Sequence, residues 1–380
     1  MPVPQGTTGA GAPARTVRPS TVRLPRVRLY ETVRTAHLER AHELAPASIV
    51  YRRRRYDFDA DLAAGLDLVE AGPLRAAWVL ARSDVREVEV NEPLMVSSLR
   101  RTALALAAVD TAARLRRRPR PVVVTYAIAN DDPWRPPARP GLPGRARRAL
   151  DRWLVGHVAR RVDRVVHGTQ ASLDLYRRLT PALLERAAHT LVPALPAPCP
   201  CGPPAPAAGG VLFVGAFEAR KGVPELLAAW PSVVARRPDA RLTLVGTGPL
   251  LDEVRAFAAS RDEVTVVVDP PREQVHALQR THAVAVLLSQ RTRTWREQVG
   301  LPVVEGLAHG CAVVTTTEGG LAGWLEEHGH RVLDPAAPAA DVAAAVVALL
   351  DAGRPAADVR ADLPAVDGRR AADAWLLPTP

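Results

Sequence analysis

The sequence predicts an α/β protein of two domains, with a parallel β-sheet at the centre of the fold. Its 380 residues are enough for two domains of ordinary size. A dense cluster of proline and glycine at 196–210, PAPCPCGPPAPAAGG, is the strongest linker signal in the chain. After this cluster, short apolar runs alternate regularly with amphipathic helical patterns. That alternation indicates a parallel sheet with helices on both faces.

The same signals divide the chain into five segments. We expect a disordered leader at 1–25, an N-terminal domain at 26–195, the linker at 196–210 and a C-terminal domain at 211–352. The remaining tail, 353–380, could pack back on the N-terminal domain.

The N-terminal half has mixed patterns. Its predicted strands are Ser48–Tyr51, Val85–Val90, Pro121–Ala127, Arg164–His167 and Thr190–Val192. Helical patterns lie between them, for example at Ala103–Leu115 and Arg145–Arg161.

The C-terminal half is more regular. Its predicted strands are Val211–Val214, Arg241–Val245, Val264–Val268, Ala283–Leu287, Ala312–Thr315 and a last one near Val332. The predicted helices are Val223–Arg236, Pro249–Ala259, Glu273–Gln279, Leu301–His309 and Asp341–Leu350.

The net charge of +10 is carried by one half of the chain. Residues 1–200 hold 33 Arg against 19 acidic residues, whereas residues 201–380 hold 17 basic and 21 acidic residues. A basic half favours an acidic partner such as a phospholipid surface, a phosphate-bearing acceptor or a nucleic acid. A solubilising excess of arginine is the alternative interpretation.

The cysteines and the hydropathy of the chain indicate its cellular location. Three cysteines do not form a disulfide framework, and Cys199 and Cys201 lack the second pair that a zinc site needs. Cys311 lies in an apolar segment and is expected in the core. There is no apolar signal-peptide region and no run of ~18 apolar residues. We expect a cytoplasmic protein, with peripheral contact on the inner face of the membrane left open.

The first candidate site is the turn Gly215–Gly222, GAFEARKG, between a strand and a helix. Parallel sheets bind ligands at the carboxyl ends of their strands, and free amides at a helix N-terminus favour anions. Lys221 is the only lysine in the chain and follows Arg220 here. A compact ammonium on a flexible stem suits a phosphate oxygen.

Two further segments occupy equivalent positions after strands. Gly246 and Gly248, in VGTGP, permit close approach of the backbone to a ligand. In Glu297-Gln-Val-Gly-Leu-Pro-Val-Val-Glu305, one glutamate precedes a helix and the other lies one turn inside it. A carboxylate there suits sugar or ribose hydroxyls, although a solvated first-turn acid is the ordinary alternative.

Taken together, these segments resemble the retaining glycosyltransferases of family 4 (glycosyl transferases group 1). The Glu-x7-Glu spacing, the Gly-Ala-Phe-Glu-x-Arg-Lys-Gly turn, Val-Gly-Thr-Gly-Pro and the Thr315–Gly320 turn occur in the family's order across residues 209–350. The resemblance implies the GT-B fold, two facing Rossmann-like domains with parallel sheets. It also implies transfer of a sugar, with retention and without metal or cofactor, from a nucleotide-diphosphate sugar such as a UDP- or GDP-sugar.

The resemblance assigns roles to individual residues. Arg220 and Lys221 would hold the donor diphosphate, with Gly215, Gly246 and Gly248 in the surrounding turns. Glu297 would contact the donor sugar and act with Arg220 and Lys221 in catalysis. Glu305 would bind the ribose, the amides of Gly300 and Leu301 would bind phosphate, and the loop after Val268 would border the base.

The N-terminal half departs from the family pattern. No histidine follows the strand predicted at Pro121–Ala127, so the acceptor-side candidates are Tyr126, Asn130 and Asp131. The acceptor class stays open among a polysaccharide, a glycolipid or lipid phosphate, and a natural product. The missing histidine also keeps open a non-catalytic nucleotide-sugar-binding partner of another transferase. The basic half suggests a nucleic-acid-binding protein as a further alternative, but aromatics are scarce beside the arginines, so we expect no nucleic-acid partner.

Two other patterns are given structural interpretations. Asp57-Phe-Asp-Ala-Asp61 contains the Asp-x-Asp of metal-dependent glycosyltransferases, but acids before a helical stretch are ordinary caps. The stripe Leu150, Trp153, Leu154 and Val158 fits a membrane-surface helix, but fits a core-facing helix better.

Overall fold

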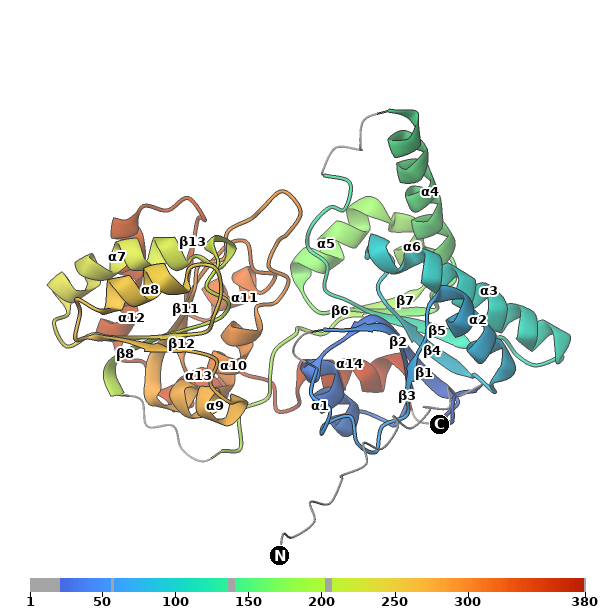
Figure 1. The fold of residues 1–380 in the computed structure, drawn as a ribbon, viewed down its shortest axis with the longest axis horizontal. Helices are drawn as coiled ribbons and strands as arrows, with labels where there is room; N and C mark the ends of the chain where they lie inside the picture. Colours follow the sequence, from blue (N-terminus) through green and yellow to red (C-terminus); the bar gives the residue numbers. More distant parts are fainter. Residues whose placement is uncertain (1–20, 56–57, 136–140, 202–206, 379–380) are drawn as a thin grey trace, which may run out of the picture.

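The computed structural model describes residues 21–55, 58–135, 141–201 and 207–378. They form two α/β units, each with its own parallel sheet (Figure 1). The predicted architecture of two parallel-sheet α/β domains is confirmed. Residues 1–20 of the predicted leader lie outside the described residues. Residues 21–25, assigned to the same leader, are held instead, because the amides of Val22 and Leu24 donate to Ser83 and Ser48.

The N-terminal sheet has seven strands in the order β3-β2-β1-β4-β5-β6-β7, all paired in parallel. The strands are β1 Arg26–Val33, β2 Ser48–Arg54, β3 Leu68–Glu70, β4 Glu87–Val90, β5 Val122–Ala127, β6 Arg164–His167 and β7 Ala188–Leu191. Its helices are α1 Thr35–Glu43, α2 Pro73–Arg82, α3 Leu99–Leu115, α4 Leu142–Ala159, α5 Gln170–Leu179 and α6 Pro181–Arg186.

Alternation along β5 separates the two faces of this sheet. Val123 joins the core beneath α2, α3 and α4, whereas Val124 points to the opposite face and packs with Ala372 and Leu376. Those two residues belong to α14 Gly368–Leu376, at the far end of the chain. The tail therefore returns to the N-terminal sheet and covers β5 and β6 (Figure 1).

The C-terminal sheet has six parallel strands in the order β10-β9-β8-β11-β12-β13. The strands are β8 Ala207–Val214, β9 Arg241–Val245, β10 Val264–Val267, β11 His282–Leu287, β12 Ala312–Thr316 and β13 Arg331–Leu333. The helices are α7 Val223–Arg236, α8 Leu251–Ala258, α9 Arg272–Thr281, α10 Leu301–His309, α11 Ala322–Glu327, α12 Ala339–Ala352 and α13 Ala356–Ala361. One continuous core fills this domain, around Trp230, Phe213 and Leu307.

Strands β1 and β3 were absent from the predicted strands, and β8 starts earlier than predicted. Strand β1 was not predicted, because Arg28 interrupts its apolar run; in the structure that arginine is 1% exposed and pairs with Glu89 and Asp373. Strand β8 begins at Ala207, inside the predicted linker. Gly209 has a φ of +81° there, and a Cβ on it would lie 2.6 Å from the carbonyl oxygen of Asp239. This glycine, which was assigned to the linker, therefore belongs to the sheet and is needed at its position.

The apolar character of the helices bears on whether the chain could span a membrane. Within the part of the chain that the structure describes, no helix combines the length and apolar character that crossing a bilayer requires.

Candidate functional site

The turn after β8 places Lys221 at the carboxyl edge of the C-terminal sheet. Residues Ala219–Lys221 form a 3-10 turn, and Gly222 then enters α7 with a left-handed φ of +77°. A Cβ on Gly222 would lie 2.1 Å from the carbonyl oxygen of Leu288, so only glycine fits. This glycine fixes the lysine beside the loop that follows β11.

Lys221 meets Glu297 directly. Its Nζ lies 2.5 Å from Glu297 Oε2, and both side chains are largely buried, at 14% and 13% exposed. The same carboxylate oxygen accepts a hydrogen bond of 3.0 Å from Ser289 Oγ. The lysine and the first glutamate of the Glu-x7-Glu segment, 76 positions apart in sequence, thus form one charged centre.

Trp295 covers the two cations of the turn and was not singled out from the sequence. The guanidinium of Arg220 lies 4.5 Å, and the Nζ of Lys221 4.9 Å, from the centre of its ring. Both distances are within the range of cation–π attraction. Arg220 also pairs with Glu218 at 2.5 Å. A tryptophan in a loop far along the chain gives no signal of this contact.

Gly246 and Gly248 hold the neighbouring turns together. A Cβ on Gly246 would lie 1.9 Å from the oxygen of Gly215, and one on Gly248 would lie 2.6 Å from the oxygen of Phe217. The sequence predicted close approach of these glycines to a ligand. The structure gives them a packing reason, because their missing side chains let the loop after β9 lie against the loop after β8.

Helix α10 presents its N-terminus to the same edge. Gly300 precedes it with a left-handed φ of +78°, and Leu301 and Pro302 begin the first turn. The first amides of a helix lack partners within the helix and can bind an anion.

Glu305, one turn further along α10, is 17% exposed and already has polar partners. Arg272 approaches its Oε1 at 3.0 Å, and Gln279 donates to its Oε2 at 3.4 Å. Arg272 also pairs at 2.8 Å with Glu39 of α1, so one arginine connects Glu305 to the N-terminal domain.

Of the acceptor-side candidates, Asn130 and Asp131 lie at the junction of the two domains. Asn130 is 5% exposed and donates to the carbonyl oxygen of Glu297 at 2.6 Å. Asp131 accepts hydrogen bonds from Arg135 and, across the junction, from Arg291 at 2.6 Å. Burial would raise the pKa of Asp131, but these two arginines outweigh it and lower the pKa below its usual value.

Tyr126 lies apart from the other two. Its ring is covered by the guanidinium of Arg369 on α14 at 4.7 Å, and burial raises its pKa to about 12. A side chain that faces the returning tail, and stays protonated, is poorly placed to exchange protons with an acceptor.

Glu92, which follows β4, is an acidic group that the sequence did not single out. Its Oε2 accepts hydrogen bonds from the amide of Ala129 at 3.0 Å and from the hydroxyl of Tyr176 at 3.2 Å. Burial raises its pKa to about 7. Glu92 therefore holds the loop that carries Asn130. Its position directly after a buried strand was the one signal available.

Of the two patterns that were given structural interpretations, one agrees with the structure and the other agrees only in part. Asp59 caps a turn by accepting from the amides of Asp61 and Leu62, as expected, whereas Asp57 lies outside the described residues. The helix α4 only partly faces the core. Leu154 and Val158 are buried, but Leu150 is 43% and Trp153 58% exposed. The core-facing interpretation is therefore wrong for half of the stripe.

Known proteins resemble this chain in its C-terminal domain and in its overall fold. Residues 208–352 match the family described as Glycosyl transferases group 1. Among solved structures, the lipopolysaccharide outer core galactosyltransferase WaaB in its apo form has a TM-score of 0.61 at 11% identity, covering 92% of this chain and 98% of its own. HepE from Anabaena, in complex with UDP, has a TM-score of 0.59 at 13% identity, covering 93% and 95%.

A third structure, the glycosyltransferase WaaG, involved in lipopolysaccharide biosynthesis, has a TM-score of 0.57 at 15% identity and covers 93% of this chain and 100% of its own. No curated protein sequence matches the chain significantly. These likenesses span both domains and show the GT-B fold, while the family match covers the domain that carries Lys221, Glu297 and Glu305. The chain is a glycosyltransferase of the GT-B fold. The glycosyltransferase thus has its candidate donor residues on the matched domain and Asn130 on the facing one.

Proposed function

We propose that this glycosyltransferase moves a sugar from a UDP- or GDP-sugar to an acceptor, with retention of configuration and without a metal ion or other cofactor, as in family 4. The observation that carries the proposal is the Lys221–Glu297 pair at 2.5 Å, in a strand-end turn beside the N-terminus of α10. HepE was solved with UDP and with UDP-glucose, which favours a UDP-sugar as the donor.

The donor diphosphate would lie against Lys221, Arg220 and the amides of Gly300 and Leu301. These groups are cationic or carry partial positive charge, so they match a diphosphate without requiring a divalent ion. Glu297, held by Lys221 and Ser289, would accept a hydroxyl hydrogen of the sugar.

The nucleoside end would lie along α10 and β10. The Glu305 carboxylate can accept about four hydrogen bonds, so acceptance from Arg272 and Gln279 leaves capacity for ribose hydroxyls. Val268, directly after β10 and 39% exposed, offers an apolar surface to the base.

In the proposed reaction, the bond between C1 of the sugar and the phosphate oxygen breaks. The acceptor oxygen bonds to C1 on the same face, and its proton passes to the departing phosphate oxygen. Lys221, Arg220 and the helix amides stabilise the charge that develops on the diphosphate, which is the term of largest effect in such transfers. This route requires no side-chain base. That agrees with the lowered pKa of Asp131, which makes its carboxylate a weaker base, and with the burial of Tyr126.

The stereochemical outcome tests the proposal. Purified protein is incubated with an α-linked UDP-sugar and an acceptor, and the anomeric configuration of the first product formed is read by NMR. We expect the α-product, at a rate that addition of Mg²⁺ or Mn²⁺ to chelated, gel-filtered protein leaves unchanged. A β-product, or turnover only with the added ion, would refute retention or metal independence respectively.

For the acceptor, we propose a lipid-linked phosphate presented at the inner face of a membrane, with contact through α2, α3 and α4. In the described part of the chain, seven of the eleven exposed large apolar side chains lie on these three helices. They are Leu74, Trp78, Leu104, Leu115, Leu142, Leu150 and Trp153. Buried residues of the three helices share one core with the N-terminal sheet, so the helices lie on the same side of it, and α4 extends beyond the sheet (Figure 1).

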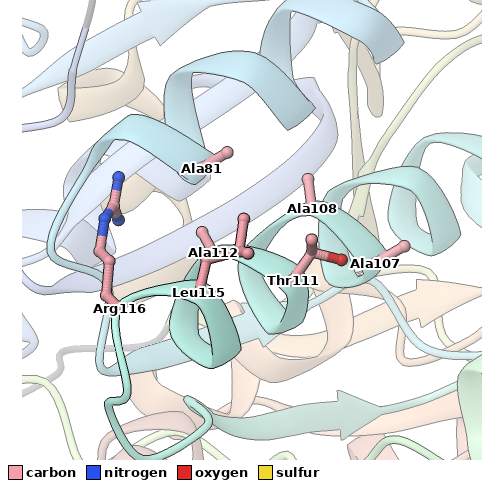
Figure 2. A pocket seen from close by; sticks show the side chains of 7 residues that line it. All are labelled: Ala81, Ala107, Ala108, Thr111, Ala112, Leu115 and Arg116. Carbon is pink, nitrogen blue, oxygen red and sulfur yellow. The ribbon is translucent and has the colours of Figure 1, made fainter.

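Cations surround these apolar side chains. Arg145, Arg147 and Arg152 are exposed on α4, and Arg82 lies over the ring of Trp78 at 5.0 Å. A shallow hollow of about 440 Å³ between α2 and α3 is lined by four alanines, Thr111, Leu115 and Arg116. Figure 2 shows these side chains, with Arg116 at one end. Exposed apolar side chains among arginines are typical of contact with an anionic lipid surface.

Sedimentation with vesicles tests this surface. The Leu150→Ala/Trp153→Ala variant should bind vesicles containing anionic lipid at least several-fold more weakly than wild type, since about 1.5–3 kcal/mol is lost for each apolar side chain withdrawn from lipid. Leu191→Ala, which changes an exposed leucine on β7, is the matched control and should bind as wild type. Equal binding by all three proteins would contradict the assignment.

A further inference from the structure

The segment Cys199-Pro-Cys201 ends against the C-terminal end of α10. The amide of Cys199 donates to the carbonyl oxygen of Ala308 at 2.9 Å, and Arg360 donates to the oxygen of Cys199 at 2.9 Å. The linker between the two domains is therefore fastened to the helix that begins at Gly300 and carries Glu305.

A third ligand joins the two sulfurs there. His309, the last residue of α10, is 4% exposed, and its Nδ1 lies 3.4 Å from Cys201 Sγ. The two sulfurs and one ring nitrogen of His309 all lie within 4.8 Å of one another. No sequence pattern indicates this cluster, because His309 is 108 positions from Cys201.

The surroundings of His309 suit a metal ligand. Its Nε2 lies 2.9 Å from Nδ1 of His276 on α9, so His276 can accept the Nε2 proton and leave the Nδ1 lone pair facing the sulfurs. Histidine ligands are commonly oriented by such a hydrogen bond from the second nitrogen.

The sulfurs also have polar support. The amide of Cys201 donates to Cys199 Sγ at 3.4 Å, and Arg360 donates to the carbonyl oxygen of the same cysteine at 2.9 Å. Thiolates are the form in which cysteines bind metals. In this structure Cys199 and Cys201 are joined as a disulfide. A small-molecule thiol would reduce that bond, giving two cysteine thiols and one disulfide of the reductant.

We propose that Cys199, Cys201 and His309 of the reduced chain form a site for a thiophilic cation such as Zn²⁺, which fastens the interdomain linker to the end of the donor-binding helix. Two thiolates and an imidazole are ligands that Zn²⁺ prefers, and a water molecule can supply the fourth position at the protein surface. Binding of the cation releases the two thiol protons.

Metal content tests the proposal. Full-length protein is reduced with a thiol, freed of reductant under argon, loaded with Zn²⁺, gel-filtered and assayed for zinc and free thiols. We expect about one zinc per chain. With Co²⁺ instead, a thiolate-to-metal charge-transfer band should appear in the near ultraviolet.

Variants separate this site from adventitious binding. Cys201→Ser and His309→Gln should lose the retained zinc, and His276→Ala should bind it roughly 10–100-fold more weakly. Cys311→Ser is the matched control, because the Cys311 thiol instead donates to the carbonyl oxygens of Gln279 and His282. Circular dichroism verifies that each variant is folded.

The outcomes that overturn the proposal are equally definite. The proposal is wrong if the reduced wild type retains no more zinc than the Cys199→Ser/Cys201→Ser variant. It is also wrong if a folded His309→Gln variant retains zinc fully, or if the Cys311→Ser variant loses its zinc. None of these readouts depends on sugar transfer, so failure here leaves the donor site unaffected.

Discussion

Replacing Lys221 by alanine is expected to abolish the thermal stabilisation that a nucleotide-sugar donor gives the native protein. A ligand at about 100 times its Kd stabilises the native state by about 2.7 kcal/mol, and that gain disappears when the ligand no longer binds. Lys221 lies 2.5 Å from Glu297, so its loss removes the central charge of the site. Turnover should fall about 10²–10³-fold, as is usual when one group that stabilises a leaving oxyanion is deleted.

The matched variant is Lys221→Arg, which keeps the charge but changes its shape. We expect partial recovery of donor binding, because a planar guanidinium cannot follow a phosphate oxygen as an ammonium does. Melting temperatures are measured with and without UDP- and GDP-sugars. A Lys221→Ala protein that responds to the donor as wild type does would show that the diphosphate binds elsewhere.

Replacing Arg369 by alanine is expected to destabilise the whole chain by about 3–5 kcal/mol, because it breaks a buried ion-pair network. Arg369 of α14 pairs with Glu89 of β4, which also accepts from Arg28 of β1 at 3.2 Å. Arg28 in turn reaches Asp373 of α14 at 3.1 Å. Removal of Arg369 leaves Glu89 with less compensation for its buried charge, and loosens the tail from the sheet.

Urea unfolding measures this effect. The control is Arg370→Ala, one residue along the same helix, where the side chain is exposed. We expect the control to unfold within about 0.5 kcal/mol of wild type. Equal midpoints for Arg369→Ala and Arg370→Ala would mean that the network contributes little and that α14 is held by its apolar contacts alone.

Much of the C-terminal domain could be predicted because its elements follow simple patterns. Arg241–Val245 is an apolar run that ends at a glycine, and the structure places β9 over those residues. Most buried side chains of this domain are apolar, so hydropathy along the sequence indicates which segments are buried.

The N-terminal sheet was harder to predict because charged residues lie inside it. Arg28 and Glu89 are buried on adjacent strands and neutralise each other through partners on α14. Since the compensating groups lie 280 and 345 positions away in sequence, no local pattern identifies β1 as an interior strand.

The candidate donor site also combines features that local patterns predict with contacts that they do not. Gly222, Gly300 and the first turn of α10 follow from strand-end and helix-start signals. The contacts of Trp295 with the two cations, and of Arg272 with Glu305 and Glu39, depend on how separate loops meet in space. The sequence predicted which strand-end segments meet at this edge of the sheet, but not the side chains that other segments contribute there.

A crystal structure of the protein with UDP tests the central claim most directly. The account predicts that the diphosphate oxygens lie within hydrogen-bonding distance of Lys221 Nζ and the amides of Gly300 and Leu301, with the ribose hydroxyls at Glu305. A diphosphate bound away from Lys221 and the N-terminus of α10 would contradict it.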